Sequence, residues 1–105
     1  MTQIEILILP SREVRRHFLA QLDDNLRGRV LNGNDGLEVI LHRDQAGNTK
    51  TVTLKRMADK FVFTRWSDVF RSWDLHTGDE VELEFMEVVG ETMHVTLRKR
   101  LIRFL

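Results

Sequence analysis

The chain has 105 residues, of which 42% are apolar and 30% charged, and it contains no cysteine. This composition predicts a single globular domain over residues 1–105 and excludes disulfides, thiolate metal sites and cysteine nucleophiles. Sixteen basic and sixteen acidic side chains give a net charge of zero, which excludes nucleic-acid binding through bulk charge.

The charges are nevertheless segregated along the chain. Residues 1–34 carry five basic and four acidic side chains, residues 35–65 six and four, residues 66–97 one and eight, and residues 98–105 four and none. A basic surface therefore forms only if the fold gathers the basic segments. No run of about eighteen apolar residues is present, so we expect no transmembrane helix and no membrane partner.

The first predicted elements are a strand and a helix, separated by Pro10. Residues 4–9 form a β-rich apolar run that ends at this proline. Ser11 can cap a helix that runs to about Leu22. Three apolar residues of this helix repeat every four positions and are expected to face the core: Val14, Phe18 and Leu22.

Another face of the same helix is basic. Arg12, Arg15 and Arg16 are spaced three and four residues apart, so they lie together near the helix start. Backbone amides at a helix start also favour anions. Such a cluster can bind phosphate, and the same pattern also occurs on ordinary solvated helix faces. Both interpretations stay open on the pattern alone.

The middle of the chain is predicted to form turns and strands. Asn, Asp and Gly clusters at residues 23–25 and 32–36 indicate turns, with residues 29–31 as a candidate short strand between them. Alternating apolar residues predict three strands, with a Gly-containing hairpin loop at residues 44–48 and a tight connection at residues 56–59. These strands are expected at residues 37–42, 49–55 and 60–64.

Both tryptophans lie in residues 64–85, which we predict to be the structural centre of the fold. Ser67 is the expected N-cap of a short helix with an apolar stripe of Val69, Phe70 and Trp73. Leu75 and a turn at Gly78-Asp79 follow. From Val81 the period becomes two, so Val81, Leu83 and Phe85 are expected to face inward, and Glu80, Glu82, Glu84 and Glu87 outward.

The C-terminal part is predicted to turn at residues 89–91 and return as a strand over residues 92–98. Residues 99–105 either extend this strand or form a tail. The whole pattern predicts a mainly β fold with two short helices and six or seven short strands. Hairpin spacing without repeated strand–helix–strand order favours a mostly antiparallel sheet closed into a barrel or sandwich.

Signals for catalysis are weak. The four histidines lie far apart without metal-ligand spacing, and there is no phosphate-binding Gly-rich loop or nucleophile elbow. His42 and His94 are expected to be surface or hydrogen-bonded residues. We therefore expect no enzyme, no metal, no cofactor and no small-molecule substrate. The glutamates of residues 80–87 are typical of a solvated sheet face that discourages edge-to-edge pairing, although such a row can also bind a cation.

Seven basic residues remain as candidates for phosphate or guanine contacts: Arg12, Arg15, Arg16, Lys55, Arg56, Lys60 and Arg65. The blocks that contain them follow a recognisable order. Residues 8–18 read ILPSREVRRHF, residues 37–55 include LEVIL and TVTLK, and residues 61–70 read FVFTRWSDVF before Leu75, Gly78-Asp79 and Phe85. This ordered set spans nearly the whole chain and resembles the plant-specific B3 DNA-binding domain.

The resemblance implies a seven-stranded open pseudobarrel with two helices that grips the major groove of duplex DNA between two arms. By position, residues 11–16 would form the first arm and residues 55–60 the second arm. The implied DNA-binding residues are Ser11, Arg12, Arg15, Arg16, Lys55, Arg56, Lys60 and, beside the Trp, Arg65. Such a protein would be a nuclear regulator of transcription.

Three departures from the family pattern favour a divergent, reproductive-meristem-like type. Arg65 stands where a Gly usually precedes the Trp, the second arm is short, and Asp59 within it would repel phosphate. The alternative hypothesis is a protein-interaction or dimerisation module, motivated by net neutrality and by the apolar-basic tail at residues 101–105. A last core strand would explain the same tail.

Overall fold

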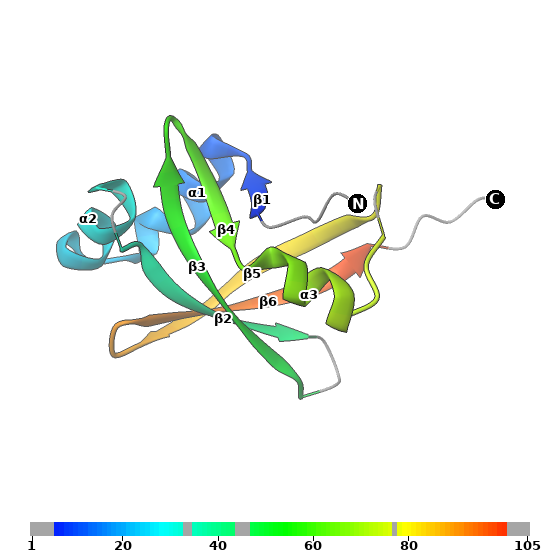
Figure 1. Ribbon diagram of the computed structural model, residues 1–105. Coiled ribbons are helices and arrows are strands. Elements are labelled where there is room, and N and C mark those ends of the chain that lie inside the picture. The colour runs from blue at the N-terminus through cyan, green and yellow to red at the C-terminus, as the bar shows by residue number, and fades with distance from the viewer. Residues whose placement is uncertain (1–5, 33–34, 44–46, 77, 101–105) are drawn as a thin grey trace.

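The computed structural model describes residues 6–32, 35–43, 47–76 and 78–100 (Figure 1). Its strands are β1 (Ile6–Leu9), β2 (Leu37–Arg43), β3 (Thr49–Met57), β4 (Lys60–Thr64), β5 (Glu80–Val89) and β6 (Thr92–Arg100). Its helices are α1 (Ser11–His17), α2 (Asp24–Asn32) and α3 (Trp66–Ser72), with a short 3-10 turn at Leu19–Gln21. None of the described helices is long and apolar enough to cross a membrane.

The six strands form one curled, open sheet in the order β1-β4-β3-β2-β6-β5, so β1 and β5 are its two edges. Four neighbouring pairs are antiparallel, but β2 and β6 are parallel, which makes the sheet mixed. The chain passes from β2 through β3, β4 and α3 into β5, and β6 then pairs antiparallel with β5 and runs in the direction of β2. The mainly β, open-barrel prediction is confirmed at this level.

The predictions of seven strands and two helices are wrong for the described part of the chain, because residues 29–31 belong to helix α2. Asp23 caps this helix: its Oδ1 accepts a hydrogen bond from the backbone N–H of Leu26 at 2.8 Å. Leu26 and Val30, four residues apart, are both buried. The Asp-Asp-Asn run that was predicted to be a turn thus begins helix α2, and burial of Leu26 and Val30 stabilises this helix.

The inside of the curled sheet and the inner faces of the helices form one apolar core. All three residues of the predicted first helical stripe are buried, although α1 ends at His17 and the 3-10 turn carries the chain on to Leu22. Alternation in β5 is also confirmed, because Val81, Leu83 and Phe85 are half-buried against the core. The burial therefore follows the apolar periods of the sequence.

The stretch around the two tryptophans is a structural centre, as predicted. Trp66, Val69, Trp73 and Leu75 are all buried in the core. The N-cap of α3, however, is Arg65 in a left-handed conformation (φ 57°, ψ 28°), so Ser67 lies inside the helix. A residue with this backbone ends β4 sharply and turns the chain directly into the helix two positions earlier than expected.

Candidate nucleic-acid interface

The first arm is the start of α1, which follows β1 directly. Pro10 occupies the N-cap position with an extended backbone (φ −61°, ψ 121°), and its carbonyl accepts from the N–H of Val14 at 3.0 Å. The predicted cap by Ser11 is therefore wrong, since Ser11 is already the first helical residue. The three arginines of the arm, Arg12, Arg15 and Arg16, are all exposed.

The second arm is the tip of the β3–β4 hairpin, which Figure 1 shows beside α1 at the top of the molecule. Its turn is Ala58-Asp59, because Met57 still pairs with Lys60. Pairing of β3 with β2 stops at Leu54, and pairing of β4 with β1 stops at Phe61. The hairpin tip therefore projects beyond both neighbouring strands as a two-stranded ribbon.

The two arms meet at Phe61. This residue pairs with Leu9, just before the first arm, and with Arg56, inside the second arm. The guanidinium carbon of Arg15 lies 5.2 Å from the centroid of the Phe61 ring, which is a cation–π contact. Segments about forty residues apart in the sequence are thus brought side by side.

The cations of the second arm point to both faces of the ribbon. Directly opposite residues of an antiparallel ladder share a face, so Arg56 lies on the same face as Phe61, towards Arg15. Lys55, opposite Val62, and Lys60, opposite Met57, lie on the other face. Arg15 and Arg56 therefore flank the junction of the arms, and the two lysines line the outside of the hairpin.

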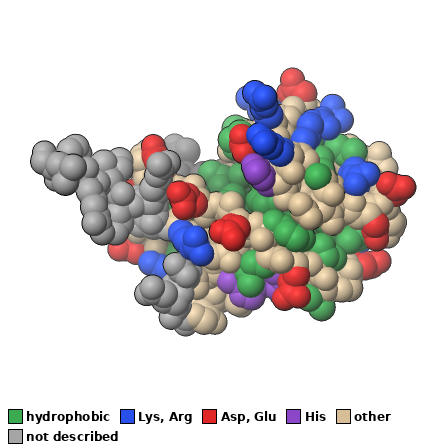
Figure 2. Space-filling model, turned by 180° about the vertical axis from the view of Figure 1, so that it is seen from behind, with side chains coloured by type: hydrophobic (Ala, Val, Ile, Leu, Met, Phe, Trp, Pro, Cys, Tyr) green, Lys and Arg blue, Asp and Glu red, His purple; other side chains and the backbone are tan. Residues whose placement is uncertain are grey.

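The arms carry an unneutralised positive charge. Residues 11–16 and 55–60 together hold six basic and two acidic side chains, a net charge of +4. Within the described ranges, none of these six cations forms an ion pair with a carboxylate. Elsewhere Arg27, Arg29, Lys50 and Arg98 pair with Asp24, Glu91, Asp68 and Glu84 at 3.1, 3.5, 3.2 and 3.6 Å. Figure 2 shows Lys and Arg side chains gathered on the projecting part of the molecule.

Arg65 is separated from the arms. It follows the far end of β4, five residues after Lys60, which corresponds to roughly 17 Å along an extended strand. Its Nη2 donates a hydrogen bond to Oγ1 of Thr53 at 3.1 Å. Among the predicted DNA-binding residues, Arg65 is therefore the one that the fold does not bring to the hairpin tip.

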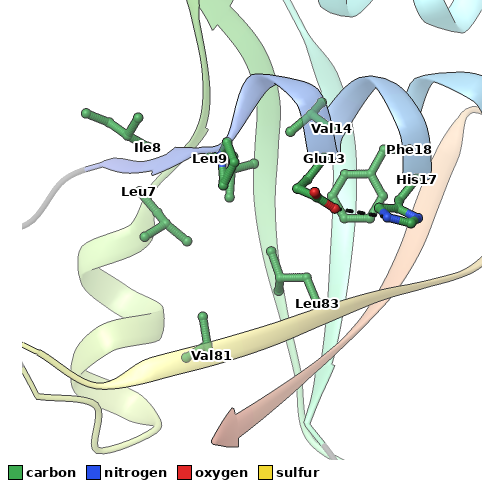
Figure 3. A pocket seen from close by; sticks show the side chains of 10 residues that line it. Leu7, Ile8, Leu9, Glu13, Val14, His17, Phe18, Val81 and Leu83 are labelled. Carbon is green, nitrogen blue, oxygen red and sulfur yellow. Dashed lines mark ion pairs between the residues drawn. The ribbon is translucent and has the colours of Figure 1, made fainter.

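A groove opens on the other side of α1, between the edge strands β1 and β5 (Figure 3). Leu7 and Leu9 of β1 face Val81 and Leu83 of β5 across it, and its cavity volume is about 340 Å³. Glu13 and His17 stand on its rim, with His17 Nε2 3.0 Å from Glu13 Oε2. The carboxylate of the first arm is thus directed to the groove side, while Arg15 lies against the hairpin.

The remaining polar cluster is a histidine pair on β2 and β6. Nε2 of His42 and Nδ1 of His94 are 2.8 Å apart, and the two rings stack with centroids 5.0 Å apart. These histidines were expected to be surface or hydrogen-bonded residues, and the contact between their rings agrees with the second possibility. No group of three or more His, Asp or Glu side chains within the described ranges is arranged to hold a metal ion.

Sequence reasoning named the charged residues of the arms but missed the role of Phe61. The alternation of residues 60–64 predicts only that Phe61 faces inward to the core. The available signal was the run Arg56-x4-Phe61 across a tight turn, which places the two residues opposite each other. The contact of Phe61 with Arg15 had no local signal.

Comparison with known proteins supports the fold. No protein-family model matches the chain, and no curated protein matches its sequence. A solved structure, the Arabidopsis FUS3–DNA complex, has a similar fold, with a TM-score of 0.66 and 13% sequence identity over 98% of this chain and 89% of that chain. The fold is B3-like. The likeness supports a B3-like fold, although the described part of the chain has six strands and three helices and not the seven and two that the resemblance implies; at this identity the likeness carries the fold alone.

Proposed function

We propose that the chain is a DNA-binding domain of the B3 family, of the divergent reproductive-meristem-like type, in a plant transcriptional regulator that acts in the nucleus. The observation that carries this proposal is the meeting of two basic segments at Phe61, with no carboxylate partner for their cations in the described structure. The B3-like fold adds support, and the FUS3 structure that shares it is a DNA complex.

The geometry suits a duplex because two kinds of contact lie next to each other. Arg12 and Arg16 on α1, with Lys55 and Lys60 on the outer face of the hairpin, are placed to neutralise phosphates. Arg56 is placed between them, and a guanidinium can bond the O6 and N7 atoms of guanine in a bidentate manner. A two-stranded ribbon and the start of a helix are both narrow enough to enter the major groove.

The net charge of zero is compatible with this function, because the positive charge is local. Counterion release depends on the number of phosphates that the arms neutralise, not on the charge of the whole chain. We also propose that the chain acts without enzymatic activity, cofactor or small-molecule substrate, since binding through the arms needs none.

Fluorescence anisotropy with a labelled duplex over a series of salt concentrations tests the proposal. If four or five arm cations contact phosphates, the slope of log K against log salt is about −4. Arg12→Ala should reduce the magnitude of this slope by about one, whereas Arg71→Ala, an exposed arginine on α3, should leave it unchanged. Absence of duplex binding by the unmodified chain at low salt would sink the proposal.

The alternative hypothesis of a protein-interaction or dimerisation module depends on the tail at residues 101–105, which lies outside the described residues. It stays a prediction. Removal of this tail, followed by sedimentation velocity, tests it: a homo-oligomer that becomes monomeric supports the module, and an unchanged monomer contradicts it.

A further inference from the structure

Arg15 is exposed like the other arginines of the first arm, but its guanidinium contacts an aromatic ring of the protein. Its guanidinium carbon lies 5.2 Å from the centroid of the Phe61 ring, and that ring is only 1% exposed. A guanidinium is planar and weakly hydrated, so it can stack on an aromatic ring while its N–H groups stay directed outward. The position of Arg15 is therefore defined by β4, although Arg15 itself belongs to α1.

The hairpin tip needs such a contact. Beyond Leu54 it has no pairing with β2, and beyond Phe61 it has no pairing with β1. A two-stranded ribbon without further support is only marginally stable in water. Helix α1 contacts β4, and the Arg15–Phe61 contact joins the two elements at the last residue of β4 that pairs with β1.

We propose that Arg15 is a positioning residue that fixes the spacing between the two arms through Phe61. This inference rests on the proposed function, because the spacing matters when both arms contact one duplex. With Arg15 on Phe61, the cations of α1 and of the hairpin are held in one arrangement before binding. Preorganised groups bind more tightly because less conformational entropy is lost on association.

Arg15→Lys tests the proposal because it keeps the charge and loses the planar stacking group. The matched control is Arg71→Lys, the same exchange at an exposed arginine of α3, outside both arms and without a ring contact in the described structure. Duplex affinity should fall roughly fivefold for Arg15→Lys and remain almost unchanged for Arg71→Lys. The salt slope should stay the same in both variants, because neither removes a charge.

A second measurement examines the free protein. Amide hydrogen exchange of residues 55–60 should be faster in Arg15→Lys than in the unmodified chain, and unchanged in Arg71→Lys. Phe61→Leu keeps an apolar side chain and removes the ring. In that background, Arg15→Lys should have no further effect on exchange, since the two residues act as a pair.

The outcomes separate this inference from the proposed function. If the unmodified chain does not bind the duplex, the proposed function fails. Arg15 then has no role in DNA binding, even if the exchange data show that it stabilises the hairpin. If the duplex binds but Arg15→Lys matches the unmodified chain in affinity and exchange, the positioning role is overturned. Lower affinity with a reduced salt slope but unchanged exchange would also overturn it, because Arg15 would then act as a phosphate contact.

Discussion

Arg65 donates a hydrogen bond from Nη2 to Oγ1 of Thr53 at 3.1 Å while its backbone is left-handed, with φ 57°. This is the position at which the resembled family usually has Gly. A Cβ atom makes this conformation unfavourable, so Gly is the residue that adopts it most easily. Arg65 therefore adopts, before Trp66, a backbone turn that Gly would adopt more easily.

The cost of this turn can be measured by comparing two variants that both remove the Arg65 side chain. Arg65→Gly should be more stable than Arg65→Ala by about 1 kcal/mol, because only the alanine retains a Cβ in the left-handed region. Urea unfolding of the two proteins gives the difference. Equal stabilities would show that the turn relaxes to another conformation when the arginine is absent.

Gly36 lies close against residues 53–55 of β3, where the second arm begins. Its φ is +72°, and a Cβ at this position would lie 2.7 Å from Cγ2 of Thr53, 2.8 Å from the Leu54 carbonyl oxygen and 2.9 Å from Cβ of Lys55. The Leu54 carbonyl oxygen and the Lys55 Cβ are fixed by the backbone, so rotation of a side chain cannot move them away. Gly36→Ala should therefore combine backbone strain with displacement of β3.

We expect Gly36→Ala to destabilise the fold by about 3 kcal/mol. Gly90→Ala is the matched control, because Gly90 has φ +62° with nothing within 4 Å of its Cβ position. That variant should lose only about 1 kcal/mol from the backbone conformation. Thermal unfolding checks both, and a similar loss at the two sites would mean that β3 yields easily at Leu54.

The parts of the fold that could be predicted are those encoded by a local sequence pattern. Strands with one buried face were predictable: β4 has the expected bounds, 60–64, and Leu37 begins β2 as expected. Helix α2 was missed because an Asp-Asp-Asn run suits both a turn and a helix N-cap. Only the burial of Leu26 and Val30 under the sheet decides between them.

The site could be predicted only as a set of basic residues. Their proximity depends on the register that places Leu9 opposite Phe61 and Phe61 opposite Arg56. The tight turn encodes the pairing of Phe61 with Arg56, but no local pattern encodes the pairing of Phe61 with Leu9, which is set across the sheet. For the same reason Arg65 was grouped with the arms on sequence order, although the length of β4 separates it from them.

The N-cap of α2 can be used to test the assignment of residues 24–32 to a helix. Asp23→Ala removes the carboxylate that accepts from the N–H of Leu26, and should destabilise the fold by about 1 kcal/mol. Asp24→Ala, which removes the exposed partner of Arg27, should have a smaller effect because surface ion pairs contribute little. Urea unfolding of both variants measures the difference. An equal loss would indicate that the charge near the helix start, and not the cap, stabilises α2.

Asp59 is the acidic residue of the second arm, and it lies exposed in the turn between β3 and β4. At the hairpin tip it would lie close to the phosphates that Lys55 and Lys60 are proposed to contact. Its carboxylate should therefore weaken binding to any duplex. Asp59→Asn removes the charge and keeps a residue that is favourable in turns.

We expect Asp59→Asn to raise duplex affinity roughly threefold at low salt, with the gain fading as ionic strength screens the phosphates. Asp74→Asn is the control, because it makes the same exchange at an exposed residue that follows α3 and is remote from the hairpin. Anisotropy titrations of both variants at two salt concentrations check this. An equal gain from Asp74→Asn would mean that total charge, and not the position of Asp59 between the lysines, determines the affinity.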